Sequence, residues 1–172
     1  MLRELAPDDA DALALVLSDP ETMKYYPAPF DQKGIQQWIE RNLRRYAEDG
    51  VGLWAMVLKA TGEMIGDCGI IRQHVEGEHL YEIGYHLRRD QWGQGLATEA
   101  AIACREWGFA NLKVDRLISL IPPENVPSCR VAERNGMTIW KEVDWRGLRH
   151  YVYTVEKRER APKLIRPSQF PS

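Results

Sequence analysis

The sequence lacks a strong net charge and lacks long apolar runs. Its 23 lysine and arginine residues nearly balance 25 aspartate and glutamate residues, which gives a formal net charge of −2. General nucleic-acid binders carry a basic excess, so we expect no nucleic-acid partner. No apolar run approaches the roughly 20 residues that span a bilayer, and the acidic start Met1–Asp9 has neither the basic nor the apolar part of a secretory signal. We therefore expect no membrane partner.

Cysteine is scarce. The cysteines are odd in number and widely spaced, which argues against a disulfide framework and favours free thiols in a reducing compartment. They are Cys68, Cys104 and Cys129. Segment 74–79 holds two histidines and two glutamates, but their spacing matches no common metal-ligand motif. The sequence thus predicts a cytoplasmic protein with no metal site.

The rest of the composition is that of one folded domain. The chain has 172 residues, of which 44% are hydrophobic, so it is long enough for one core and too apolar for a disordered chain. Periodicity disappears over residues 157–172, which contain three prolines and five basic residues. We expect a domain over residues 1–156, followed by a Pro-containing basic tail over residues 157–172.

Hydrophobic periodicity indicates a mixed α+β domain. Apolar residues at helical spacing predict four helices, and alternating or continuous apolar segments predict six or seven strands. Gly66 and Gly69 lie inside one strand, where they indicate a bulge or a close backbone approach. The predicted helices cover residues 7–18, 35–47, 99–110 and 125–135, and the predicted strands cover residues 53–58, 64–73, 80–87, 114–121, 137–145 and 148–156.

A glycine-rich turn joins the predicted strand 80–87 to the next helix, with the sequence Trp92-Gly93-Gln94-Gly95-Leu96-Ala97-Thr98. Such a turn presents several backbone N–H groups and the positive end of a helix dipole, which suits a diphosphate. Tight packing alone would also explain two glycines, since lone glycine patterns have a high false-positive rate. The turn lacks the Gly-Lys-Ser/Thr end of a P-loop and the three spaced glycines of a dinucleotide-binding turn.

A second motif, Asn125-Val126-Pro127-Ser128, opens the following helix, and Arg134-Asn135-Gly136-Met137 closes it. By itself it is a capped helix. Together with Tyr81-Glu82-Ile83-Gly84-Tyr85 and the glycine-rich turn, in this order and spacing, it makes the sequence resemble the GNAT superfamily of acetyl-CoA-dependent N-acetyltransferases. Trp92, where the wider superfamily has arginine or glutamine, resembles the Rim-type branch of ribosomal-protein N-terminal acetyltransferases. The resemblance covers about residues 2–156.

The resemblance implies the GNAT fold: a six- to seven-stranded, mostly antiparallel sheet with about four helices. Its splayed parallel pair would be strands 80–87 and 114–121, with the pantetheine arm of acetyl-CoA in the gap. A backbone N–H near Leu87 would polarise the thioester carbonyl. The resemblance also implies residues that bind acetyl-CoA. At the pantetheine they are Tyr85, His86, Leu87 and Arg88, and at the pyrophosphate they are Trp92, Gly93, Gln94, Gly95, Leu96, Ala97 and Thr98. Asn125 and Ser128 would bind from the next helix, and Arg130 or Arg134 would meet the adenosine phosphates, unless these arginines only form a solvated helix face.

Aminolysis of a thioester requires a neutral amine. Deprotonation at pH 7 costs roughly 4–5 kcal/mol for a lysine-like amine but only about 1 kcal/mol for an α-amine, so a general base is useful for the first and nearly optional for the second. Glu82 is the candidate base, because burial on an apolar strand would raise its pKa; a structural carboxylate is the alternative. The resemblance implies Ser128 as proton donor to the leaving thiolate, since Ala132 stands where many GNAT enzymes have tyrosine. Asp144 and Glu142 are reserve acidic residues.

The sequence therefore predicts a cytosolic enzyme that transfers acetyl directly from acetyl-CoA to a primary amine. Two rival functions are a CoA-binding sensor or scaffold without turnover, and an acyltransferase that uses a larger donor such as succinyl-CoA. The acceptor is left open among a protein N-terminus, a polyamine, an aminoglycoside and an amino-acid analogue. A homodimer is one of the oligomeric states left open.

Overall fold

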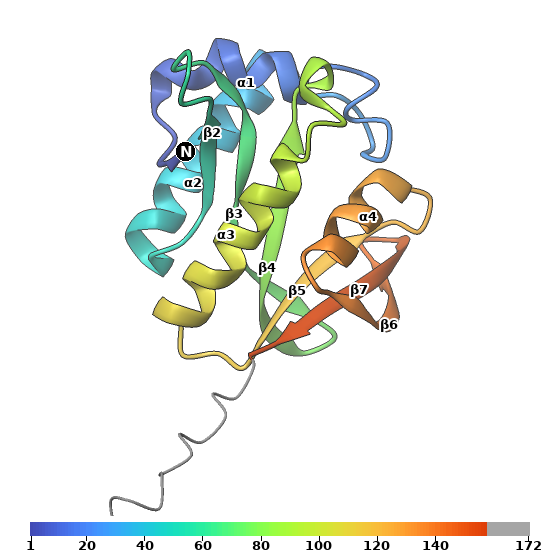
Figure 1. Cartoon of the computed structure of the whole chain (residues 1–172). Coiled ribbons are helices and arrows are strands. Elements are labelled where there is room, and N and C mark those ends of the chain that lie inside the picture. The colour runs from blue at the N-terminus through green and yellow to red at the C-terminus, as the bar shows by residue number, and fades with distance from the viewer. Residues whose placement is uncertain (158–172) are drawn as a thin grey trace, which may run out of the picture.

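The computed structural model describes residues 1–157, which form a seven-stranded mixed sheet with helices on both faces (Figure 1). The strand order is β1-β2-β3-β4-β5-β7-β6, and neighbouring strands are antiparallel except for the parallel pair β4 and β5. The predicted α+β class is confirmed. The strands are β1 (Leu2–Arg3), β2 (Leu53–Val57), β3 (Met64–Val75), β4 (Glu78–Leu87), β5 (Arg116–Ile121), β6 (Thr138–Trp145) and β7 (Leu148–Glu156). The helices are α1 (Ala10–Leu17), α2 (Gln32–Asp49), α3 (Leu96–Asn111) and α4 (Val126–Arg134), with short 3₁₀ helices η1 (Pro7–Asp9) and η2 (Arg89–Gln91).

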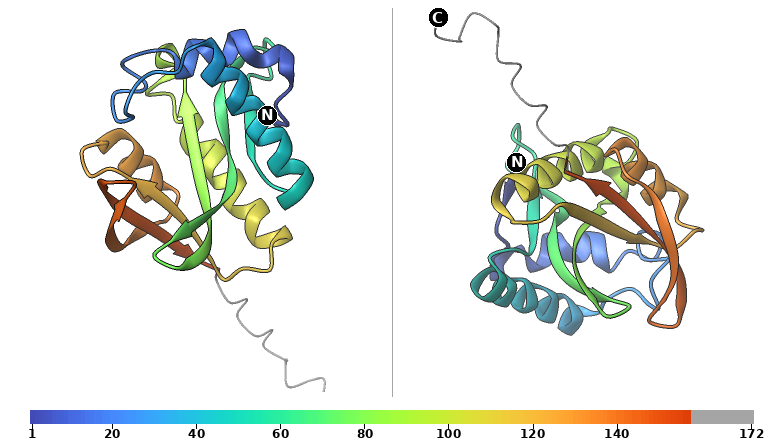
Figure 2. Two further views of the ribbon diagram at one scale, coloured as in Figure 1. Left: turned by 180° about the vertical axis from the view of Figure 1, so that it is seen from behind. Right: turned by 90° about the horizontal axis from the view of Figure 1, so that it is seen from below.

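The helices divide between the two faces of the sheet. Helices α3 and α4 cover one face, and α1 and α2 cover the other (Figures 1 and 2). Ala101 of α3 packs in one buried cluster with Ile70 and Leu117, while Leu13 and Ile35 belong to a second cluster under α1 and α2. The sheet thus separates two layers of helices, and a molecule bound on one face can contact a molecule bound on the other only where two strands of the sheet separate.

The sheet opens between β4 and β5. These strands share a single bridge, Glu82 with Ile118, whereas β4 pairs with β3 along its whole length. The Ser119 hydroxyl donates to the Ile83 carbonyl at 2.7 Å and closes the narrow end of the gap. In Figure 1, β5 turns away from β4 beyond this point. The predicted splayed parallel pair is confirmed.

Local signals determine where α2 begins and ends. The Asp31 carboxylate accepts from the Gly34 N–H at 2.7 Å at the start, and Gly50 ends the helix with φ of +68°. Asn42 is fully buried, and its side-chain oxygen accepts from the Leu53 N–H at 2.9 Å. This hydrogen bond fixes α2 against β2, and so fixes which side chains of α2 face the open part of the sheet.

One predicted boundary is wrong. We expected a connection over residues 74–79, but β3 and β4 extend through this segment and leave a two-residue turn, Glu76-Gly77, with φ of +47° and +89°. Left-handed residues at both positions are the usual solution for a tight hairpin. The close backbone approach at Gly66 is confirmed, because a Cβ there would clash with the His86 carbonyl oxygen.

The remaining expectations divide into tested and untested. The three cysteines are free, as predicted, and all three are buried. Within residues 1–157, no helix is both long and apolar enough to cross a membrane. The predicted tail over residues 157–172 lies outside the described residues, apart from Lys157.

Candidate active site

The turn before α3 offers a row of free backbone donors. Gly93 and Gly95 both have φ of +78°, the left-handed conformation that favours glycine. Within residues 1–157, the backbone N–H groups of residues 93–98 have no hydrogen-bond partner, and the Glu99 N–H is the first to bond, to the Gly95 carbonyl at 3.0 Å. Trp92 fastens the turn to the end of β4, since its indole N–H donates to the Leu87 carbonyl at 2.7 Å. The turn therefore suits a diphosphate.

Backbone groups of β4 alternate between β3 and the gap toward β5. The Arg88 N–H donates to the Ile65 carbonyl at 2.8 Å, so Arg88 and, two residues earlier, His86 direct their backbone groups to β3. Tyr85 and Leu87 direct theirs to the other side, where β5 has turned away. Tyr85 and Leu87 are thus placed to hold a ligand in the gap, whereas the backbone of His86 is not.

The polar groups of Arg88 are engaged within the protein. Its N–H is used in the sheet, and its carbonyl accepts from the Gln91 N–H at 2.9 Å. Its guanidinium bonds to Asp90 at 2.6 Å and to Glu63 at 2.7 Å, and these carboxylates raise the pKa of Arg88. These contacts direct Arg88 away from the gap, and its role in binding acetyl-CoA stays a prediction.

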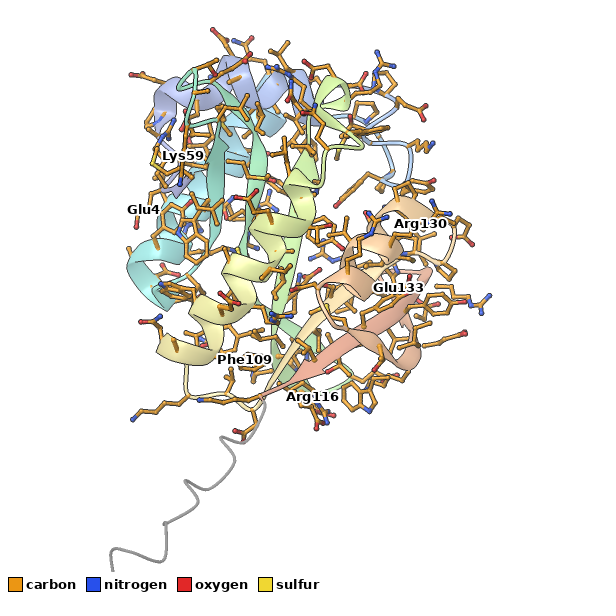
Figure 3. All side chains as sticks on the ribbon, in the orientation of Figure 1. Glu4, Lys59, Phe109, Arg116, Arg130 and Glu133 are labelled. Atoms are coloured by element: carbon orange, nitrogen blue, oxygen red, sulfur yellow. The ribbon has the colours of Figure 1, made fainter. Side chains whose placement is uncertain are left out.

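The N-terminus of α4 faces β4 across the gap. Asn125 caps the helix, since its side-chain oxygen accepts from the Ser128 N–H at 3.2 Å. The Tyr85 hydroxyl donates to the Ser128 carbonyl at 2.8 Å and so ties β4 to α4. Arg130 lies exposed on the surface of α4 (Figure 3), without an ion-pair partner in residues 1–157. The structure thus brings Asn125 and Ser128 to the gap and leaves Arg130 at its rim.

A cavity of about 270 Å³ lies where β4 and β5 separate. Its wall includes Asn125 and Ser128 from the α4 side of the sheet, Trp38 and Arg45 from α2 on the other side, and Glu82 between them. The glycine-rich turn lies at the α3 end of this opening, so a second substrate would enter from the side of α1 and α2. The two predicted catalytic residues, Glu82 and Ser128, line the same cavity.

Glu82 is held by two hydrogen bonds from uncharged donors. One carboxylate oxygen accepts from the Gln73 side-chain N–H at 2.6 Å, and the other accepts from the Leu120 N–H at 3.4 Å. Burial raises the pKa of Glu82, while the hydrogen bonds from Gln73 and Leu120 oppose the rise. A carboxylate with a raised pKa and no arginine bonded to it is a stronger base than an ordinary surface carboxylate.

The reserve carboxylates do not reach the cavity wall. Asp144 is exposed, and its carboxylate accepts from the Gly147 N–H at 2.8 Å, which closes the turn between β6 and β7. Glu142 is bound to Arg149 by two hydrogen bonds of 2.8 Å on the surface, and this contact lowers the pKa of Glu142. Asp144 is therefore not supported as a catalytic base, because its carboxylate stabilises a turn.

A hydrogen-bonded chain beside Glu82 was not predicted from the sequence. Asp67 is fully buried in β3; it accepts from the Trp38 indole at 2.8 Å and bonds to His86 Nδ1 at 2.7 Å. His86 Nε2 in turn bonds to the Tyr26 hydroxyl at 2.6 Å. The signal was a charged residue inside the apolar stretch Ile65–Ile71. The side chain of His86, and not its backbone, is thus the part that faces the cavity.

Three arginines of the cavity wall were also not predicted as site residues. Arg41 and Arg45 lie one turn apart on α2, and Arg146 lies in the turn between β6 and β7. The spacing of four residues places Arg41 and Arg45 on one face of the helix, a signal present in the sequence. The proximity of Arg146 depends on the tertiary fold alone.

Comparison with known proteins identifies the family. The model of the acetyltransferase (GNAT) domain matches residues 1–138. The chain is 40% identical to YkkB of Bacillus subtilis over 150 residues, which cover 87% of this chain and 80% of YkkB. It is 32% identical over 170 residues to the uncharacterized N-acetyltransferase p20 of Bacillus licheniformis, with 93% and 94% of the two chains covered.

Among solved structures, an acetyltransferase from Agrobacterium tumefaciens superposes with a TM-score of 0.78 at 31% identity, covering 91% of this chain and 90% of that one. Its fold agrees with the splayed sheet described above. On the family match and these relatives, the chain belongs to the GNAT family of acetyltransferases.

Proposed function

We propose that this protein transfers the acetyl group of acetyl-CoA directly to a primary amine, with Glu82 as general base and Ser128 as proton donor to the leaving thiolate. The observation that carries the proposal is the single cavity that holds both side chains at the opening between β4 and β5. Glu82 belongs to β4 at one edge of this opening, and Ser128 belongs to α4, which follows β5 at the other edge. A base on one side and a proton donor on the other match a transfer between two substrates that meet there.

The chain offers a continuous set of groups for acetyl-CoA. The free N–H groups of residues 93–98 would hold the pyrophosphate, and the backbone of Tyr85 and Leu87 would hold the pantetheine. The side chain of Asn125 lies at the same opening. When bound, acetyl-CoA supplies an activated acetyl group as a thioester.

Different residues of the cavity would accept and donate the protons of the reaction. Glu82 would accept a proton from the amine, so that the amine nitrogen can form its bond to the acetyl carbon as the carbon–sulfur bond breaks. The Leu87 N–H would donate to the thioester oxygen. Ser128 would give its hydroxyl proton to the departing sulfur and recover one from solvent. The products are an N-acetylated amine and free CoA.

Finer assignments rest on the sequence. Trp92 and Ser128 support membership of the Rim-type branch, and the free buried cysteines agree with a cytoplasmic location. The domain boundary at residue 156 and the formation of a homodimer stay predictions.

Calorimetric titration with acetyl-CoA tests the proposal, with CoA and ATP as controls. We expect acetyl-CoA and CoA to bind in the micromolar range and ATP not to bind. A thiol-release assay with Glu82→Gln and Ser128→Ala then tests catalysis. Binding without any turnover would favour the sensor, turnover with succinyl-CoA only would favour the larger donor, and no binding of acetyl-CoA would refute the proposal.

A further inference from the structure

Three guanidinium groups surround the acceptor end of the cavity. Arg41 and Arg45 reach it from α2, and Arg146 reaches it from the turn between β6 and β7. These elements lie about a hundred positions apart in the sequence, so the cluster is a product of the fold. Arg146 has φ of +53°, a left-handed conformation that is uncommon for a residue with a side chain.

None of the three guanidinium groups has a carboxylate partner within residues 1–157. Arg45 donates to the side-chain oxygen of Asn42 at 3.3 Å. The guanidinium carbon of Arg41 lies 5.8 Å from the centre of the Trp38 ring, and that of Arg146 lies 5.3 Å from the centre of the Trp145 ring. These contacts orient the guanidinium groups without pairing any of them to a carboxylate. By contrast, seven other arginines form ion pairs: Arg3, Arg72, Arg88, Arg89, Arg105, Arg116 and Arg149.

The cavity is electropositive as a result. Among residues 1–157, Glu82 is the single carboxylate in the cavity wall, against three arginines. Burial lowers the pKa of Arg45, and the positive charges of Arg41 and Arg146 lower it further, while the negative charges of Glu82 and Asp49 oppose this change. Arg41 and Arg146 therefore both lie near enough to Arg45 for their like charges to repel it. An anion placed between them would relieve this repulsion and could bind in the forked geometry that guanidinium groups favour for carboxylate and phosphate.

We propose that the acceptor is a small primary amine that also carries an anionic group, a carboxylate or a phosphate, bound by Arg41, Arg45 and Arg146 with its amine directed to Glu82. The inference rests on the proposed acetyl transfer and names the acceptor class. The cavity volume of about 270 Å³ lies below the roughly 300–1,000 Å³ of sites for drug-sized ligands, so the acceptor is small. Polyamines and aminoglycosides carry several positive charges and would meet three arginines, with one carboxylate already needed as the base.

Matched acceptors test the proposal in the thiol-release assay. An amino acid is compared with its amide, and phosphoethanolamine with ethanolamine; spermidine, an aminoglycoside and an acidic N-terminal peptide complete the panel. The amide of an amino acid has the more readily deprotonated amine, so it would react faster if charge did not matter. We expect each anionic acceptor to exceed its neutral partner by about 10- to 100-fold in kcat/KM, the effect of one or more hydrogen bonds to a charged group.

Substitutions locate the effect. Arg45→Gln and Arg146→Asn should each raise the KM for the anionic acceptor about 10-fold or more, with the KM for acetyl-CoA unchanged; asparagine tolerates the backbone conformation at position 146. Arg44→Gln is the matched control, because Arg44 is exposed on α2 and lies outside the cavity wall. Thermal melting and acetyl-CoA affinity confirm that each variant is folded.

The outcomes separate the two proposals. A protein that binds acetyl-CoA but acetylates no anionic amine faster than its neutral partner, or prefers spermidine or the aminoglycoside, overturns the acceptor proposal alone. So does an unchanged acceptor KM in both cavity variants. Preference for the acidic peptide over the small anionic amines overturns the small-molecule assignment. A protein that does not bind acetyl-CoA refutes the acetyl-transfer proposal, and the acceptor proposal falls with it.

Discussion

Replacing Glu82 with glutamine should lower kcat by about 10²- to 10⁴-fold for an amine that is protonated at neutral pH, the usual contribution of a general base. The fold should survive the change. The glutamine oxygen can accept from the Leu120 N–H, and the Gln73 amide can turn over to accept from the new NH₂ group, so both contacts of Glu82 have a replacement. An α-amine near pKa 8 should lose less activity, because its deprotonation costs only about 1 kcal/mol.

The pH profile gives a sharper test than the rate. Because burial raises the pKa of Glu82, wild-type kcat/KM should fall as the pH drops through this raised pKa, where the carboxyl becomes protonated and cannot accept a proton. Gln73→Leu removes a hydrogen bond that favours the charged form, so it should move this acidic limb to higher pH. The shift should be clearly measurable, because a hydrogen bond to a charged group is among the stronger hydrogen bonds in proteins.

The assay is steady-state release of CoA as a function of pH for the wild type, Glu82→Gln and Gln73→Leu. Glu82→Gln should lose the acidic limb set by the carboxyl and follow the fraction of free amine. If Glu82→Gln keeps the wild-type rate and profile, Glu82 is a structural carboxylate and the reasoning is refuted.

Three further predictions follow from individual contacts. Ser128→Ala should lower kcat about 10²-fold with the KM for acetyl-CoA unchanged, and an unchanged kcat would exclude Ser128 as the proton donor. Gly95→Ala should weaken acetyl-CoA binding, measured by calorimetry, about 5- to 30-fold, since the left-handed backbone conformation costs a residue with a Cβ about 1–2 kcal/mol. Gly62→Ala, at a similar φ of +73° in another turn, is the control and should leave acetyl-CoA binding unchanged. Asp67→Ala should lower the free energy of unfolding in urea by about 3–5 kcal/mol, because it leaves the buried Trp38 indole and the His86 ring without their acceptor. Asp90→Ala, at an exposed position, is the control and should change it far less; equal effects would contradict the structural role of Asp67.

Part of the site was predictable because it is local. The turn at residues 92–98 depends on two glycines with positive φ followed at once by a helix, and both features lie within a few positions of one another. The cap of α4 by Asn125 is equally local. Alternation along β4 placed Glu82 and His86 on one side and Tyr85 and Leu87 on the other, and burial of Glu82 followed from the apolar strand around it.

Other parts depend on strand register. Pairing of β4 with β3 uses the Arg88 N–H for the Ile65 carbonyl, and this decides that Tyr85 and Leu87, not His86 and Arg88, offer backbone groups to the gap. A shift of one residue would reverse the assignment, since side and direction alternate along a strand. The resemblance to the GNAT superfamily implies binding roles for all four residues alike. It does not distinguish residues whose backbone groups face the gap from residues whose backbone groups pair with β3.

The sequence by itself thus determined the order of the elements and the glycine-rich turn, and it offered Glu82 as a candidate base. The resemblance to the GNAT superfamily implied the opening of the parallel pair and the role proposed for Ser128. Only the tertiary structure decided which charges share the cavity. Tyr26 meets His86 across 60 positions, and Arg146 comes close to Arg45 through the packing of a hairpin turn opposite a helix. Contacts between distant segments depend on how whole elements pack, and no periodicity within one element records which neighbour it will face.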